Sequence, residues 1–275
     1  MGGRTILAAA AALTLLAAQA QAAPASVYME DLTLPELQAR LADARPVALI
    51  FTGGTEATGP SVAYGKHNAR AHAYAGDIAR QLGNAIVAPV LPFAPNSDKL
   101  KGVAGTITLT SETFTAVNEQ VARSLIGGGF KRVALLGDHG PSQAPLKALA
   151  DKLDAEFAPQ GVRVFFISDN YARARTEIEA QIRASGHTSG GHGGLWDTAE
   201  TWAVAPALVR PTTLHPGDLT DEGNGPLSAE GFSGDPRGAT PAMGRKFGAL
   251  RVRLAVEELK RDLAQADTAA PVAAK

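Results

Sequence analysis

Short, continuous apolar runs recur along the first two thirds of the chain and predict buried strands. Each run is bounded by glycine, proline or polar residues, as is typical of strands that are covered on both faces of a sheet. Such strands lose the alternation of polar and apolar positions because neither face meets water. The predicted strands span residues 46–51, 85–91, 132–136 and 162–167.

Longer segments with apolar residues at helical spacing lie between and after these runs and predict amphipathic helices. The predicted helices span residues 34–42, 69–82, 111–126, 144–157, 197–207 and 241–263. Apolar strands that alternate with helices are typical of a mostly parallel sheet covered by helices on both faces. The pattern therefore predicts an α/β fold, a three-layer α/β/α sandwich with a mostly parallel central sheet.

The length and composition fit one globular domain. The chain has 275 residues, of which 45% are hydrophobic and 19% charged, and its formal net charge is −1. A near-neutral charge gives no electrostatic reason to expect a nucleic acid or an anionic membrane as a partner. We find no internal repeat, and we predict a single domain over residues 23–263. The alanine-rich residues 264–275 are predicted to form a disordered tail.

The first residues have the pattern of a secretory signal peptide. Arg4 supplies a positive charge, residues 6–18 form an apolar stretch, and Ala20 and Ala22 are the small residues that a signal peptidase reads. The stretch is shorter than the roughly 20 residues that a membrane span needs. We therefore predict cleavage after Ala22 and a periplasmic or secreted protein with no membrane anchor. The chain has no cysteine, which excludes disulfides and lipoprotein anchoring.

Polar residues that can bind a ligand or take part in catalysis follow three of the predicted strands. Glu56 comes after the first strand, Asn96 after the second and His139 after the third. In parallel α/β sheets, ligands bind at the carboxyl ends of the strands. The sequence therefore predicts a functional site at that edge of the sheet.

Carboxylates and imidazoles gather in three segments, residues 53–68, 137–140 and 187–200. Metal sites in hydrolases need such ligands to converge from several loops and to leave one position open for water. The candidate metal ligands are Glu56, His67, His139 and Asp197.

Each candidate also has a structural interpretation. Glu56 can cap the helix that follows it, His67 can lie in a surface loop, and Asp197 can be a first-turn acid that stabilises a helix. His192 is the strongest functional candidate because glycine on both sides lets the backbone approach a ligand closely.

Several of these motifs, in this order, resemble those of the creatininase (creatinine amidohydrolase) family. The family's Gly-x-x-Glu-x-His-Gly-Pro is similar to residues 53–60, its strand followed by Asn-Gly-His-Gly-Gly-Asn to residues 132–142, and its His-(Ala/Gly)-Gly-x-x-Glu-Thr-Ser to residues 192–199. Further motifs resemble residues 104–109 and 234–244. The resemblance spans roughly residues 47–254 and implies a creatininase-like fold.

The resemblance also implies a divalent metal site, often binuclear, that contains zinc, manganese or iron. Glu56, His139 and Asp197 stand where the family has metal ligands, whereas His67 replaces an aspartate that bridges two metals and Thr58 replaces a ligand histidine. Imidazole bridges two cations poorly and threonine is a weak zinc ligand. These departures favour one ion over two, held by Glu56, His67, His139 and Asp197.

The implied activity is hydrolysis of a C–N bond in a small cyclic amide or formamide. His192 stands where the family has a catalytic histidine, and we expect it to pass a proton to the leaving nitrogen. Asp138 is expected to orient His139. The candidate substrate-binding residues are Lys66, Asn68, Asn96 and Ser189.

Two questions stay open at this point. Thr188 and Ser189 stand where creatininase has side chains that bind its substrate, so creatinine is not the expected substrate. The alternative function is a catalytically impaired, creatininase-fold protein that binds a ligand in the periplasm; the changes at Thr58, Pro141 and Ser142 favour it. The family often forms oligomers, which leaves a homo-oligomer open.

Overall fold

The computed structural model describes residues 26–188, 190–217, 227 and 229–268 of the chain. The predicted signal peptide, its cleavage site and residues 269–275 lie outside this range. Within the described part of the chain, no helix is both long enough and apolar enough to cross a membrane.

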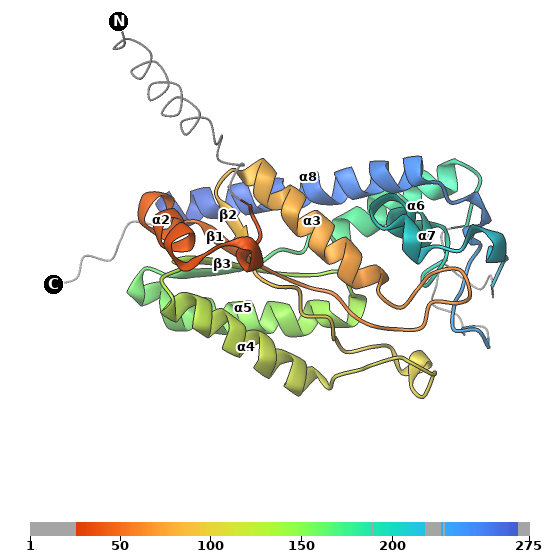
Figure 1. The fold of residues 1–275 in the computed structure, drawn as a ribbon, viewed down its shortest axis with the longest axis horizontal. Helices are drawn as coiled ribbons and strands as arrows, with labels where there is room; N and C mark the ends of the chain where they lie inside the picture. The colour runs from red at the N-terminus through yellow and green to blue at the C-terminus, as the bar shows by residue number, and fades with distance from the viewer. Residues whose placement is uncertain (1–25, 189, 218–226, 228, 269–275) are drawn as a thin grey trace, which may run out of the picture.

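A parallel sheet forms the centre of the described structure (Figure 1). Its strands are β1 (Val47–Thr52), β2 (Ala85–Val87), β3 (Arg132–Gly137) and β4 (Arg163–Phe166), in the order β2-β1-β3-β4. All three strand pairs are parallel. Every residue of β1 is buried, which explains its continuous apolar sequence. The predicted parallel sheet is confirmed.

One face of the sheet is covered by α3 (Lys66–Leu82) and α8 (Pro241–Thr268), which lie above the sheet in Figure 1. Leu49 and Phe51 of β1 point to this side and share a buried cluster with Ile78 of α3 and Val252 of α8. Because side chains alternate along a strand, the intervening positions of β1 serve the other face.

The opposite face is covered by α4 (Ser111–Gly127) and α5 (Gln143–Phe157). Ala48 and Ile50 pack there against Phe114 of α4 and Leu149 of α5. Helix α2 (Leu34–Ala44) contributes apolar side chains to the edge of the same cluster, and a capping box between Thr33 and Glu36 starts this helix. The molecule is therefore the predicted three-layer α/β/α sandwich.

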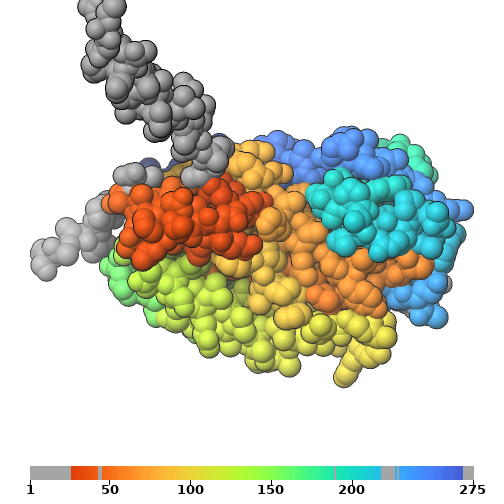
Figure 2. Space-filling view, in the orientation of Figure 1, coloured from red at the N-terminus to blue at the C-terminus, as the bar shows by residue number. Residues whose placement is uncertain are grey.

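A third cluster lies beyond the carboxyl ends of the strands and joins α6 (Ala172–Ala184), α7 (Leu195–Val204) and α8. Helix α6 is not among the helices that the sequence pattern predicts. Its apolar face consists of Ala174, Ile178 and Ile182, spaced four residues apart among charged residues. In Figure 2, α7 (cyan) packs against the orange segment that contains α3.

Several predicted boundaries shift. Helix α7 ends at Val204 because Pro206 disfavours helical backbone at the residue before it. Helix α8 continues to Thr268, so the first residues of the predicted disordered tail are helical. Short 3₁₀ turns connect the larger elements: Met29–Asp31, Asp98–Leu100, Gly140–Ser142, Ala158–Gln160, Pro206–Leu208, Pro211–Thr213 and Pro236–Gly238.

Candidate metal centre

The loop that follows β1 carries Glu56 and is fixed by Asn68 of α3. The side-chain oxygen of Asn68 accepts a hydrogen bond from the backbone N–H of Gly54 at 3.0 Å. A Cβ atom at Gly53 would collide with the same oxygen, so the chain needs glycine at that position. Asn68 therefore holds the loop in place, and it does not line the cavity described below.

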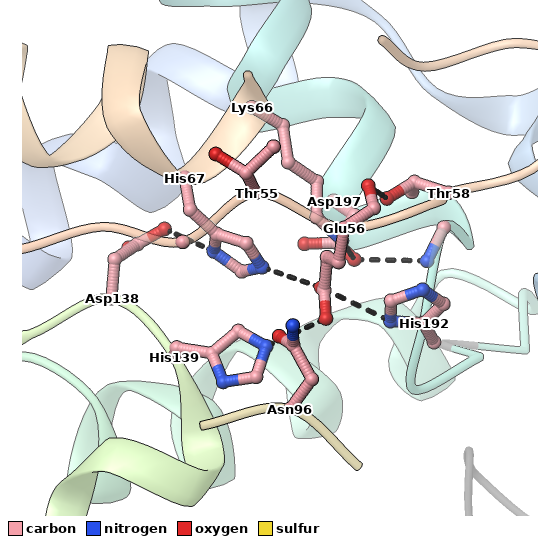
Figure 3. Close-up of polar contacts among 12 residues, drawn as sticks. Thr55, Glu56, Thr58, Lys66, His67, Asn96, Asp138, His139, His192 and Asp197 are labelled. Atoms are coloured by element: carbon pink, nitrogen blue, oxygen red, sulfur yellow. Dashed lines mark hydrogen bonds and ion pairs between the residues drawn. The ribbon is translucent and has the colours of Figure 1, made fainter. Parts of the chain in front are cut away.

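The carboxylate of Glu56 lies between two imidazoles (Figure 3). Its Oε1 is 2.8 Å from Nε2 of His67, and its Oε2 is 2.7 Å from Nε2 of His139. The residue is 1% exposed. Burial alone would raise the pKa of the Glu56 carboxyl, but His139 and Lys66 outweigh it and hold the pKa well below its usual range. Glu56 is therefore ionised.

His67 lies in the first turn of α3, whereas the sequence pattern places it in the loop before that helix. Its Nδ1 is 2.7 Å from Oδ2 of Asp138. Arg70 and Arg251 outweigh burial and hold the pKa of Asp138 far below its usual range, so this carboxylate is ionised and can accept a proton from Nδ1. Nη2 of Arg70 lies 2.9 Å from the same nitrogen. The prediction that Asp138 orients His139 is wrong, because Asp138 orients His67.

His139 follows β3, and its backbone carbonyl accepts hydrogen bonds from Ser142 at 2.6 Å and from Gln143 at 3.0 Å. Burial lowers the pKa of His139 even though the Glu56 charge opposes this effect, which favours the neutral imidazole. Its Nδ1 is buried and has no hydrogen-bond partner among the described residues. A neutral ring of this kind is the form that binds a metal ion.

Glu56, His67 and His139 together offer a suitable ligand set for one divalent ion. One ligand atom from each lies within 4.8 Å of the others, and all three residues are buried. Two imidazoles and one carboxylate with an open side suit zinc, manganese or iron(II). The orientation of His67 by a carboxylate is also common at metal sites. The residues therefore fit the predicted metal.

Asp197, the fourth predicted ligand, has other partners. Its Oδ2 lies 2.8 Å from Nζ of Lys66 and accepts a hydrogen bond from Gly193 N–H at 2.9 Å, while its Oδ1 lies 2.7 Å from Arg70. Lys66 and Arg70 outweigh burial and hold the pKa of Asp197 well below its usual range. Asp197 thus neutralises buried cations at the start of α7, and this arrangement does not support the predicted role of metal ligand.

Buried arginines and carboxylates form a network of ion pairs next to the candidate ligands. Arg251 of α8 contacts Oδ1 of Asp138 at 2.6 Å and Oε2 of Glu200 at 2.9 Å. Arg70 contacts the same Asp138 at 2.8 Å. Arg70, Glu200 and Arg251 are not among the predicted site residues. The available signal is spacing: Arg70 lies one helical turn after His67, and Glu200 one turn after Asp197.

His192 lies beside the same carboxylate. Its Nε2 donates to the backbone carbonyl of Ala57 at 2.7 Å, and its Nδ1 is 3.5 Å from Oε1 of Glu56. Burial and the charge of Lys66 lower the pKa of His192 to about 4. The ring is therefore neutral at pH 7, and Nδ1 is the nitrogen that can accept a proton. The next residue, Gly193, has a φ of 71°, a conformation that glycine adopts readily.

A cavity of about 400 Å³ joins these residues. Its lining includes the polar residues Glu56, His67, His139, His192 and Asp197 and the less polar residues Leu100, Pro141, Tyr171, Trp196 and Leu227.

Of the predicted substrate-binding residues that the structure describes, only Lys66 lines this cavity. Lys66 lines the cavity, but its ammonium group is fully buried between carboxylates. Asn96 is not among the lining residues; its side chain donates to the carbonyl of Ile107 at 2.9 Å and fixes a loop. Ser189 lies outside the described residues.

Comparison with known proteins gives one family. The model of the creatininase family, described as creatinine amidohydrolase, matches residues 30–259. No curated protein sequence matches the chain.

Solved structures of creatininases have a similar fold. A mutant creatininase of the Zn–Zn type has a TM-score of 0.74 at 21% identity, with 87% of this chain and 99% of that chain covered. A mutant creatininase complexed with creatine gives 0.73 at 22% identity, with 86% and 99% covered. A manganese creatininase gives 0.70 at 20% identity, with 86% and 99% covered.

Proposed function

The chain belongs to the creatininase family, and on this basis we propose that it is an exported amidohydrolase that uses one divalent ion to hydrolyse a C–N bond. The substrate class is a small cyclic amide or formamide other than creatinine. The observation that carries the proposal is the position of Glu56, 2.8 Å from Nε2 of His67 and 2.7 Å from Nε2 of His139.

Glu56, His67 and His139 would hold the ion. When bound, a divalent ion supplies Lewis acidity, which polarises an amide carbonyl and makes water a better nucleophile. The zinc and manganese forms of similar creatininases favour these two metals over iron. Asp138 fixes the ring of His67 through Nδ1, so that Nε2 stays directed at the carboxylate of Glu56.

His192 is positioned to move a proton. The carbonyl of Ala57 fixes its tautomer, with the proton on Nε2, so Nδ1 presents a lone pair beside Glu56. A neutral imidazole in this orientation can accept a proton from an attacking water molecule and deliver it to the leaving nitrogen. The resemblance to the family predicts only the delivery of the proton to the leaving nitrogen. The position of Nδ1 supports both this delivery and the earlier acceptance of the proton from water.

The cavity suits a small substrate. Trp196 and Leu100 line the same cavity as the carboxylate and imidazoles, so a ring can lie against apolar surface while its amide faces polar groups. Its volume of about 400 Å³ favours a ligand of a few rings at most. We propose a small-molecule amide as the partner.

The first test is metal analysis of the purified protein followed by a screen of lactams, formamides and cyclic ureas. We expect one bound ion per chain and turnover of at least one of these amides. His139→Ala is expected to lose both, because it removes one of three ligands. Retention of metal and full activity by His139→Ala would contradict the proposed site.

The second candidate function is capture of a ligand without catalysis. The hydroxyl of Thr58 donates to the backbone carbonyl of Glu56 at 3.3 Å, so it does not replace the family's ligand histidine. A binding protein does not need a metal ion in stoichiometric amount. Full-length protein that contains no metal, yet binds a lactam without hydrolysing it, would favour this candidate.

The predicted location outside the cytoplasm depends on residues 1–22. Fractionation of cells that produce the full chain, with N-terminal sequencing of the mature protein, tests it. We expect the mature sequence to begin at Ala23 in the periplasm or the medium.

A further inference from the structure

Lys66 is a fully buried cation at the edge of the proposed metal site. Its Nζ lies 3.2 Å from Oε1 of Glu56 and 2.8 Å from Oδ2 of Asp197, and its side chain is 0% exposed. A buried ammonium group is strongly destabilising unless carboxylates compensate it. The first turn of α3 therefore presents a cation and, at the next residue, the metal ligand His67 to the same carboxylate oxygen of Glu56.

The two carboxylates that Lys66 joins are those that a second divalent ion beside Glu56 would require. Such an ion needs carboxylate oxygens at about 2.0–2.2 Å, and the ammonium group lies between these oxygens. Like charges at such a separation repel strongly in a buried site. Asp197 is further engaged by Arg70 and by the backbone of Gly193.

The other polar groups described beside Glu56 do not form a second group of three metal ligands. Within the described part of the chain, Glu56, His67 and His139 form the one group of three that can hold an ion. The hydroxyl of Thr58, which is buried nearby, is directed to a backbone carbonyl. The second position therefore has two carboxylates with a cation already between them. The one further imidazole described beside Glu56 is that of His192, whose Nε2 is engaged by the carbonyl of Ala57.

We propose that the ammonium group of Lys66 is a built-in substitute for a second divalent ion. It neutralises Glu56 and Asp197, fixes the orientation of the Glu56 carboxylate, and limits the site to one metal ion. Lys66 is thus a positioning residue and not a substrate-binding residue. This inference rests on the proposed metal-dependent function.

The test is the metal stoichiometry of the full chain, measured by elemental analysis after equilibrium dialysis against zinc or manganese chloride. We expect about one ion per wild-type chain and about two in Lys66→His or Lys66→Asp, because each variant replaces the ammonium group with a ligand. Adding Asp197→Ala to either variant should return the ratio to one. With manganese, electron paramagnetic resonance should change from an isolated-ion spectrum to a coupled one.

The control is Lys147→His on α5, where an exposed lysine also faces a carboxylate, Asp151 at 2.6 Å. This variant should keep the wild-type ratio. Thermal unfolding and circular dichroism establish that both Lys66 variants are folded, and two variants are made because either can fail to fold.

The outcomes separate the two proposals. A wild-type protein without metal contradicts the proposed function. A wild-type protein with two ions contradicts the single-ion site and the role of Lys66, but leaves a metal-dependent amidohydrolase in place. Folded Lys66→His and Lys66→Asp proteins that both stay at one ion overturn only the role of Lys66.

Discussion

The carboxylate of Asp138 orients His67, 2.7 Å away, although His139 is its neighbour in sequence. This relationship joins the residue that follows β3 to the first turn of α3, and it fixes which nitrogen of His67 faces Glu56. The proposed ligand set therefore depends on a residue that is not part of it.

Asp138→Asn should weaken metal binding. The amide holds Nδ1 of His67 less strongly, and loss of such a partner typically lowers metal affinity by about 10–100-fold. The measurement is zinc affinity by competition with a chelator. Asp154→Asn is the control, because Asp154 pairs with Arg163 on the other side of the sheet and should not change affinity. Unchanged zinc affinity in a folded Asp138→Asn protein would show that the contact has no role in binding.

His192→Ala should separate metal binding from turnover. The variant is expected to keep its metal, because His192 is outside the ligand group, and to lose about 10²–10⁴-fold in kcat, the usual contribution of a general base. The measurements are metal content and kcat on an amide found in the screen. His187→Ala, an exposed histidine of the same segment, should retain both. A His192→Ala enzyme with wild-type kcat would remove His192 from the mechanism.

Arg251→Met should strongly destabilise the protein. The change leaves the carboxylates of Asp138 and Glu200 buried with one cation fewer, and breaking a buried pair in this way costs about 3–5 kcal/mol. The measurement is the free energy of unfolding in urea. Arg253→Met, in an exposed pair with Glu257 on the same helix, should change that free energy by less than about 1 kcal/mol. Equal effects of the two substitutions would contradict the importance of the buried network.

The metal-free protein should lose stability in acid, and Asp197 should contribute to this loss. The pKa of Asp197 lies well below its usual value of 3.8 because Lys66 and Arg70 outweigh burial. Its stabilisation is therefore fully present above about pH 4 and falls as the pH drops through the lower, folded-state pKa.

Asp197→Asn should flatten the acid limb of a plot of unfolding free energy against pH, measured in a chelator. Asp77→Asn, whose carboxylate is half exposed beside Arg80, serves as the control and should leave the slope nearly unchanged. An acid limb of Asp197→Asn that matches the wild type would show that Asp197 titrates normally in the folded protein.

The sheet and the strand-end residues are predictable because their signals are local. Continuous apolar runs mark all four strands, and the rule that parallel strands end at one edge of a sheet is enough to bring Glu56 and His139 together. Helix α6 escapes prediction because charged residues surround its three apolar positions, and no local signal indicates that these positions meet α7 and α8.

The site is less predictable, because its partners are distant in sequence. Proximity along the chain assigns Asp138 to its neighbour His139, although β3 directs the carboxylate toward α3. Asp197 has the residue type of a metal ligand, and no local pattern indicates that Lys66 and Arg70, which are distant in sequence, engage it. Charged residues in amphipathic helices are usually solvated, so no sequence pattern indicates that Arg251 is buried.

Arg251 also connects the end of the described chain to the candidate metal centre. It lies on the last described helix, yet it contacts the carboxylate that aligns the proposed ligand His67, far away in the sequence. In a nascent chain, the carboxylate of Asp138 therefore lacks one of its two arginine partners until the final helix has docked. The alignment of His67, near the start of the described chain, thus depends on a helix at its end.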